Sequence, residues 1–152
     1  MSDAMTVRPP SPEAIAAFRR HLSLSQKAAL ASEIVGTYVQ ARRWLRRNDL
    51  HETVRVLREV GPPAREPDGD QLLLGIRLGQ IVGKTLGVLP ADSRCLVRSL
   101  VLTSLLVRRG IQSSLIIGVR SEPKFEAHAW VECAGMPLLP PGDEPYGRLV
   151  EL

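Results

Sequence analysis

The spacing of apolar residues divides the chain into a long helical part and a shorter part with strand-like alternation. Between residues 25 and 47, apolar side chains recur every three to four positions, which is the period of an amphipathic helix. The stripe consists of Leu30, Ile34, Tyr38, Ala41 and Leu45. This pattern predicts a helix that packs one face against a core.

Capping residues predict where two further helices begin. Asp49 followed by Glu52 is a capping-box pattern, so a short helix is expected there, ending at the Gly-Pro-Pro sequence 61–63. Asp70 is predicted to cap a third helix that ends near Gly87.

The hydrophobic period changes after a fourth helical segment, which stops at Gly110. Short runs of aliphatic and β-branched residues follow, as is typical of strands. The expected strands are 113–119, 125–133, 136–139 and 146–152. Ala134-Gly135 is a turn signal that would make the second and third strands antiparallel. Helices first and a small antiparallel sheet last predict an α+β fold.

Length and composition favour one compact domain outside the membrane. The chain has 152 residues, 44% of them hydrophobic, and no apolar run approaches the roughly 20 residues needed to span a bilayer. Residues 1–12 are polar and Pro-rich, which predicts a disordered tail without a signal peptide and a cytoplasmic location. The loop 61–70 would then separate a helical N-terminal region, 13–70, from a core region, 71–152.

Composition excludes several classes of function. Cys95 and Cys133 are too few for a disulfide framework, and no Cys/His spacing fits zinc, so neither metal nor other cofactor is expected. The net charge of +4 raises the question of nucleic acid. The arginines are dispersed and only 4% of residues are aromatic, which argues against nucleic-acid binding.

Cys95 is the first candidate for chemistry. It follows Asp92 and Ser93, either of which can cap a helix, so Cys95 is expected in the first turn of the fourth helix. The free backbone N–H groups and the helix dipole at that position favour an anion, and the thiolate is the reactive form of cysteine. Taken alone, however, a cysteine on an apolar helix is usually a small core residue.

His128 is the second candidate, because a cysteine at a helix start and a histidine on a following strand can form a nucleophile and its base. A lone strand histidine is otherwise usually structural. Strand alternation puts His128, Trp130 and Glu132 on one face and Cys133 on the other, so Cys133 is not expected to contact His128. Glu132 lies about 13 Å along the strand from His128, too far to orient the imidazole.

Asp143 is the candidate for the group that orients His128. A tight turn at Ala134-Gly135 would pair His128 with Pro141, which makes Asp143 its diagonal neighbour within about 8 Å. A carboxylate there can accept a hydrogen bond from the imidazole and hold the useful tautomer. The alternative is that Asp143 is a solvated turn residue.

Four segments together resemble one family, the stand-alone transglutaminase-like leader peptidase of lasso-peptide biosynthesis. They are 93–100 (SRCLVRSL), 105–111 (LLVRRGI), 115–119 (LIIGV) and 127–132 (AHAWVE). The resemblance covers roughly 72–152. It implies a papain/transglutaminase-like core with N-terminal helices and a small antiparallel β-sheet. Cys95 and His128 match the family's catalytic positions. In the family, the catalytic aspartate follows the hairpin in a Leu-x-Asp context, but this chain has Leu138-Leu139-Pro140 there. Asp143 would therefore complete a triad only if the chain has a short insertion relative to the family. The alternative is a Cys-His dyad.

The resemblance also implies the activity and the partners. Such a peptidase removes the leader peptide from a ribosomally made lasso precursor, which a separate leader-recognition protein delivers, and an ATP-dependent cyclase acts on the freed core. The alternatives are an acyl or amine transferase on the same scaffold and a non-catalytic helical binding module.

Three more residues are candidates for binding. Arg43 and Arg46 belong to an arginine cluster at the end of the first long helix; they are either a docking surface for the partner or leader, or solvated cations that complement a helix C-terminus. Trp130 either shields the site and touches the substrate, or only fills the core.

Overall fold

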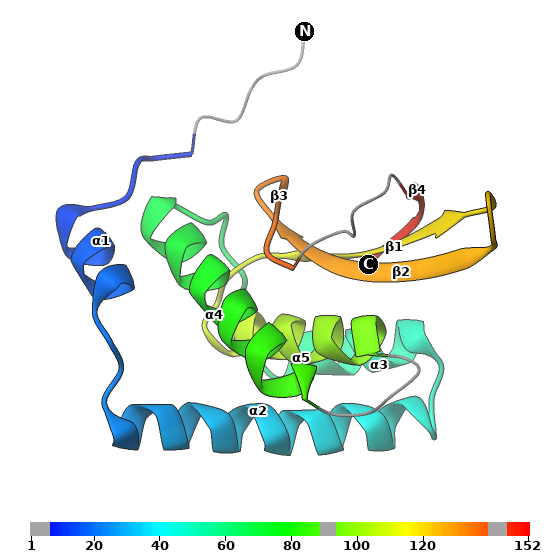
Figure 1. The fold of residues 1–152 in the computed structure, drawn as a ribbon, viewed down its shortest axis with the longest axis horizontal. Coiled ribbons are helices and arrows are strands. Elements are labelled where there is room, and N and C mark those ends of the chain that lie inside the picture. The colour runs from blue at the N-terminus through cyan, green and yellow to red at the C-terminus, as the bar shows by residue number, and fades with distance from the viewer. Residues whose placement is uncertain (1–6, 89–93, 140–145) are drawn as a thin grey trace, which may run out of the picture.

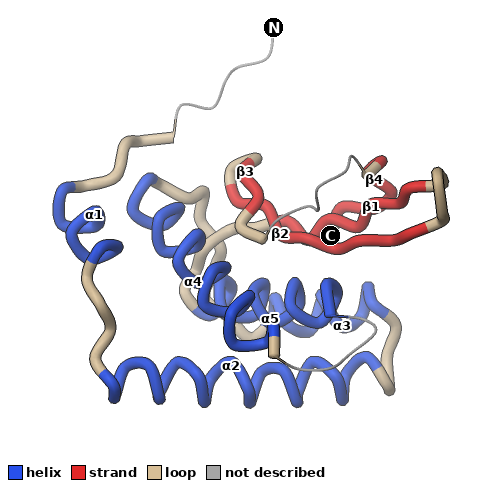
Figure 2. The backbone as a smooth tube through the Cα atoms, viewed as in Figure 1, coloured by secondary structure: helices blue, strands red, loops and turns tan. Residues whose placement is uncertain are grey.

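Five helices precede a four-stranded sheet in the computed structural model, which describes residues 7–88, 94–139 and 146–152 (Figures 1 and 2). The helices are α1 (Pro12–Arg19), α2 (Leu24–Leu45), α3 (Leu50–Glu59), α4 (Gly69–Gly87) and α5 (Arg94–Arg108). The strands are β1 (Ser114–Arg120), β2 (Glu126–Cys133), β3 (Met136–Pro137) and β4 (Gly147–Glu151), all antiparallel in the order β3-β2-β1-β4. The α+β prediction is therefore confirmed.

Helix α5 is the centre of the molecule. It lies between α2 and the sheet in Figure 1, and it packs against α2, α3, α4, β1 and β2. Its side chains are buried all round: Leu100, Val101, Leu102, Leu105 and Leu106 are each 0% exposed. A helix that is buried on nearly every face lies inside a core rather than on the surface. The helices before and after the loop 61–70 therefore share one continuous core.

The predicted helix over 25–47 is present as α2, and its predicted stripe points inward. Ile34 and Ala41 are buried, and Leu30, Tyr38 and Leu45 pack against the same core. A capping box at Ser23 and Gln26 starts the helix. Asp49 caps α3 as expected, accepting a hydrogen bond of 2.8 Å from the Glu52 N–H.

The predicted cap of α4 is wrong. Asp68, not Asp70, caps this helix, because Asp68 has Gln71 three residues later and the two form a reciprocal capping box. Asp70 lies in the first turn and accepts hydrogen bonds from the N–H and the hydroxyl of Ser11, at 2.6 and 2.9 Å. These two bonds hold the pKa of the Asp70 carboxyl below its usual value.

The same contact corrects the expectation for part of the N-terminal segment. Ser11 caps α1, a helix that the sequence did not predict, while it is bonded to Asp70. A β-carbon on Gly69 would collide with the backbone of Pro9 and Pro10, so this segment packs tightly on the start of α4. Residues 7–12 therefore pack on the protein as an arm. Helix α1 has only 8 residues and buries none of them, which explains why its pattern was too weak to predict.

Sheet register follows the predicted turn. Ala134 and Gly135 have φ of 51° and 74°, which suits a two-residue hairpin turn, and Cys133 pairs with Met136 as expected. The third strand ends at Pro137, earlier than predicted, although the Leu138 N–H still donates to the Val131 carbonyl at 2.8 Å.

Within the described ranges, no helix combines the length and the apolar character needed to cross a membrane.

Candidate active site

Cys95 is the second residue of α5, so its predicted position in the first helical turn is confirmed. Its side chain is half-buried and carries a free thiol. The proposed caps, Asp92 and Ser93, lie outside the described residues. Because α5 packs against β2, the cysteine helix and the histidine strand are neighbouring elements. The start of α5 and the start of β2 lie at the same end of the molecule (Figure 1).

Arg98 adds a positive charge to the first turns of α5. It lies three residues after Cys95, and residues at this spacing share a helix face. Its Nη2 reaches the end of α4, 3.7 Å from where a β-carbon on Gly87 would lie. Its Nε is buried and has no hydrogen-bond partner within the described ranges. Arg98 therefore places its guanidinium between the first turns of α5 and the end of α4.

His128 lies in β2 directly opposite Gly118 of β1, and its ring is flanked by two aromatic rings. The ring centroid of Trp130 is 6.1 Å away with an interplanar angle of 21°, and that of Tyr146 is 5.3 Å away at 28°. Both separations are within the range of favourable ring contacts. The structure thus brings His128 and Trp130 together, as alternation predicted.

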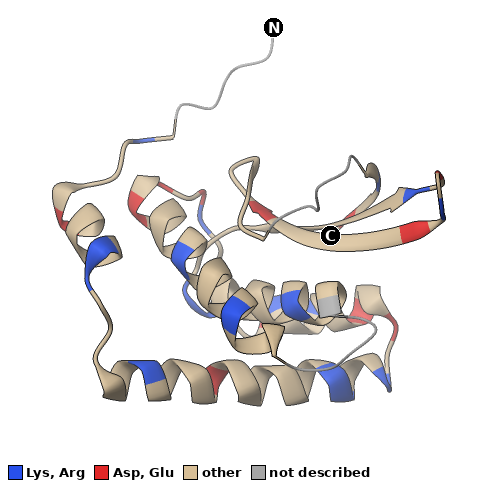
Figure 3. Ribbon diagram, in the orientation of Figure 1, with Lys and Arg blue, Asp and Glu red and all other residues tan. Residues whose placement is uncertain are grey.

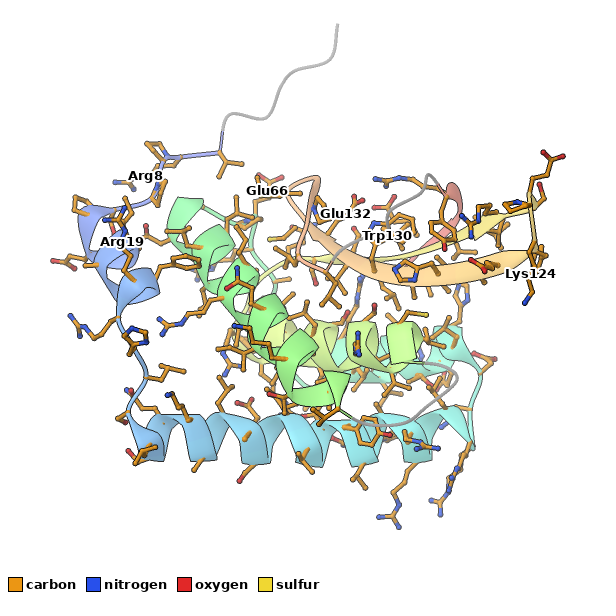
Figure 4. The ribbon with its side chains drawn as sticks, viewed as in Figure 1. Arg8, Arg19, Glu66, Lys124, Trp130 and Glu132 are labelled. Carbon is orange, nitrogen blue, oxygen red and sulfur yellow. The ribbon has the colours of Figure 1, made fainter. Side chains whose placement is uncertain are left out.

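Trp130 is 4% exposed, which leaves it little surface for contact with a substrate. Its Nε1–H donates to Glu132 Oε1 at 2.8 Å, and Arg148 Nη2 donates to both oxygens of the same carboxylate at 2.7 Å. Trp130 and Glu132 lie on the same side of the sheet (Figure 4). Glu132 therefore serves to hold Trp130.

Cys133 lies on the opposite face of β2, as alternation predicted. It is 0% exposed, and its thiol donates to the Gln112 carbonyl at 3.4 Å. Burial raises the pKa of this thiol to about 11. Because the thiolate is the nucleophilic form, burial and the raised pKa disfavour Cys133 as a nucleophile.

Tyr146 is a neighbour of His128 that the sequence pattern did not single out. Its hydroxyl donates to Glu126 Oε2 at 3.3 Å, and the guanidinium of Arg120 lies 5.4 Å from the centre of its ring. Arg120 also pairs with Glu126 at 2.5 Å. The sequence signal that could have found Tyr146 is its place at the start of the last expected strand.

Asp143, predicted to orient His128, lies outside the described residues. No group of three or more His, Cys, Asp or Glu side chains is placed to hold a metal ion in the part of the chain that is described.

Arg43 and Arg46 lie at the C-terminal end of α2, where Figure 3 shows Lys and Arg positions in blue. This end of α2 lies at the same end of the molecule as the start of α5. Arg43 lines a groove of about 470 Å³ on α2. The other lining residues are Gly36, Val39, Gln40, Trp44, Arg47 and Asn48. Arg46 is exposed and follows the last residue of the helix.

The protein has an α+β fold in which a central helix packs on an antiparallel sheet. The helix carries a cysteine in its first turn, and the second strand of the sheet carries a histidine. These are the elements from which a cysteine-nucleophile enzyme is built. The chain belongs to the transglutaminase-like superfamily, whose family model matches residues 35–151. This superfamily typically contains cysteine peptidases and transferases with a Cys-His-Asp site. No curated protein sequence and no solved structure matches the chain.

Proposed function

We propose that the protein is a cysteine peptidase that removes the leader peptide from a lasso-peptide precursor. The observation that carries the proposal is the position of Cys95 in the first turn of α5, packed on the strand that carries His128, in a chain of the transglutaminase-like superfamily. The choice of a lasso precursor rests on the resemblance of the four sequence segments around these residues.

In the proposed reaction, the Sγ of Cys95 attacks the carbonyl carbon at the leader–core junction while His128 takes the thiol proton. His128 then gives that proton to the leaving amine, which is the N-terminus of the core peptide. Water hydrolyses the thioester, releasing the leader with a free carboxylate and restoring the thiol. Backbone N–H groups at the start of α5 would stabilise the oxyanion.

Asp143 remains our proposal for the group that orients His128, with a Cys-His dyad as the alternative. The two differ in what Asp143→Ala would do. A triad requires a loss of activity, whereas a dyad tolerates the change.

The function is tested by incubating the protein with its precursor and the leader-recognition protein, then measuring intact masses. Cleavage at the leader–core junction is the expected result. A released leader that carries an added amine on its C-terminal carbonyl, heavier than the hydrolysed leader by the amine less one water, would instead indicate a transferase, an activity that the superfamily match also fits. An unchanged precursor that nevertheless binds would contradict both activities and favour a binding module.

The groove on α2 is our candidate for the surface that receives the delivered precursor. Its lining includes the apolar Val39, which is 48% exposed, and the basic Arg43. Within the described ranges, Arg43, Arg46 and Arg47 make no ion pair, since the pairs that are present involve other arginines. A groove lined by apolar side chains and by arginines without ion pairs fits an acidic segment with an apolar anchor.

The double variant R43E/R46E is expected to lower partner-dependent cleavage about tenfold, the effect of losing roughly 1.4 kcal/mol of attraction. Alkylation of Cys95 should not change. The matched control is R19E/R20E, which reverses two exposed arginines at α1. If both double variants cleave the delivered precursor at the wild-type rate, the groove is not the docking surface.

A further inference from the structure

The two rings that flank His128 are each held by the same kind of anchor. Trp130 donates to Glu132, whose carboxylate is held by Arg148. Tyr146 donates to Glu126, whose carboxylate is held by Arg120. Each ring is therefore tied to a carboxylate, and each carboxylate to an arginine. The arrangement around the imidazole therefore uses two rings, two carboxylates and two arginines, whereas a single core contact needs only one neighbouring side chain.

Gly118 makes room for this arrangement. It pairs with His128 across β1 and β2, and β1 is an inner strand of the sheet, where glycine weakens a strand. A β-carbon at Gly118 would lie 2.8 Å from Trp130 Cζ3 and 2.8 Å from Tyr146 Cβ. Real β-carbons essentially never approach neighbours that closely, so any larger residue would push the two rings apart. The absence of a side chain at this position lets both rings approach the imidazole.

The path of β4 brings Tyr146 to the same place. The β1–β4 register shifts between Ile117 and Gly118, so that Gly118 pairs with Arg148 and Val119 with Gly147. Tyr146 precedes Gly147, and its Cβ is therefore next to Gly118. One register irregularity thus positions both the ring beside His128 and the arginine that holds Glu132.

We propose that Tyr146 and Trp130 are positioning residues that clamp the imidazole of His128 between them and fix the direction of its ring. This inference rests on the proposed role of His128 as the base. The χ2 torsion of a histidine is intrinsically broad, so flanking rings are an effective way to restrict it. The imidazolium formed when His128 accepts the thiol proton also lies against two aromatic faces, which attract a cation.

Tyr146→Leu, which removes the ring, is expected to lower kcat for cleavage about tenfold, a part of the roughly 10²- to 10⁴-fold that a positioned base contributes. KM should stay the same, because the clamp acts on the imidazole and not on the bound precursor. Tyr146→Phe keeps the ring and should restore most of kcat. Gly118→Ala forces the two rings apart without altering either, and should also lower kcat. Gly83→Ala is the matched control, because a β-carbon there meets nothing within 4 Å.

The alkylation rate of Cys95 by iodoacetamide, measured on the full chain without any precursor, separates the clamp from the proposed function. His128→Ala should slow alkylation, and Tyr146→Leu and Gly118→Ala should slow it in part. Suppose that His128→Ala slows alkylation, but Tyr146→Leu and Gly118→Ala show wild-type alkylation and wild-type kcat. The proposed clamp is then disproved, whereas the proposed role of His128 as the base is retained. If His128→Ala leaves alkylation unchanged, both proposals fail. Circular dichroism identifies any variant that does not fold. If either Tyr146→Leu or Gly118→Ala is unfolded, the other variant alone tests the clamp.

Discussion

Replacing Cys95 with alanine is expected to abolish cleavage of the precursor, lowering kcat at least about 10³-fold, as removal of a nucleophile does in other hydrolases. No other thiol can take its place, because Cys133 is buried on the opposite face of β2 and burial raises its pKa to about 11. Fold and partner binding should be retained, since Cys95 is only half-buried at the start of α5. Intact-mass analysis of the reaction over time measures the loss.

The control is Cys133→Ser. A serine hydroxyl can replace the thiol as donor to the Gln112 carbonyl, so this variant should keep the wild-type rate wherever it remains folded. Cleavage by Cys95→Ala at a rate near that of the wild type would exclude cysteine catalysis. Loss of activity in a folded Cys133→Ser would show that the wrong thiol has been assigned.

Periodicity predicted the fold well where a helix or strand has one buried face. The stripe from Leu30 to Leu45 was visible in the sequence because α2 buries it against α5 and leaves the rest in solvent. The turn at Ala134-Gly135 was predictable because few residue pairs tolerate two consecutive positive φ angles. In both cases, the residues of the element itself are enough to predict its structure.

Predictions failed where two segments distant in sequence decide the outcome. Asp70 and Asp68 are both competent caps, and only the contact of Asp70 with Ser11 shows that Asp70 has another role. Helix α1 is stabilised by its cap and by packing on α4, neither of which leaves an apolar stripe in the sequence.

The candidate site was only partly predictable for the same reason. The positions of Cys95 and His128 follow from a helix start and a strand, which are local features. Tyr146 and Gly118 depend on the pairing of β1 with β4 and on the register shift within it. Alternation along one strand cannot reveal a neighbour that another strand supplies.

Gly79→Ala is expected to be strongly destabilising for a change that adds a single methyl group. A β-carbon at Gly79 would collide with the backbone carbonyl oxygen of Leu138, and a backbone cannot rotate away as a side chain can. Overpacking of this kind costs about 3 kcal/mol, which corresponds to a fall of roughly 10 °C in Tm for a domain of this size. Because Leu138 follows β3, the change also separates α4 from the edge of the sheet.

Gly83→Ala, one turn later in the same helix, is the matched comparison. A β-carbon there meets nothing within 4 Å, so the substitution only removes the flexibility of glycine and should raise the free energy of unfolding by about 0.5–1 kcal/mol. Thermal and urea unfolding of the two variants therefore should move in opposite directions from the wild type. Equal and small shifts for both would mean that α4 does not lie against Leu138 as closely as the structure shows. If only Gly79→Ala greatly lowers the free energy of unfolding, the contact between α4 and the edge of the sheet stabilises the whole domain. The same contact then also helps to hold β2, the strand that carries His128, in its position.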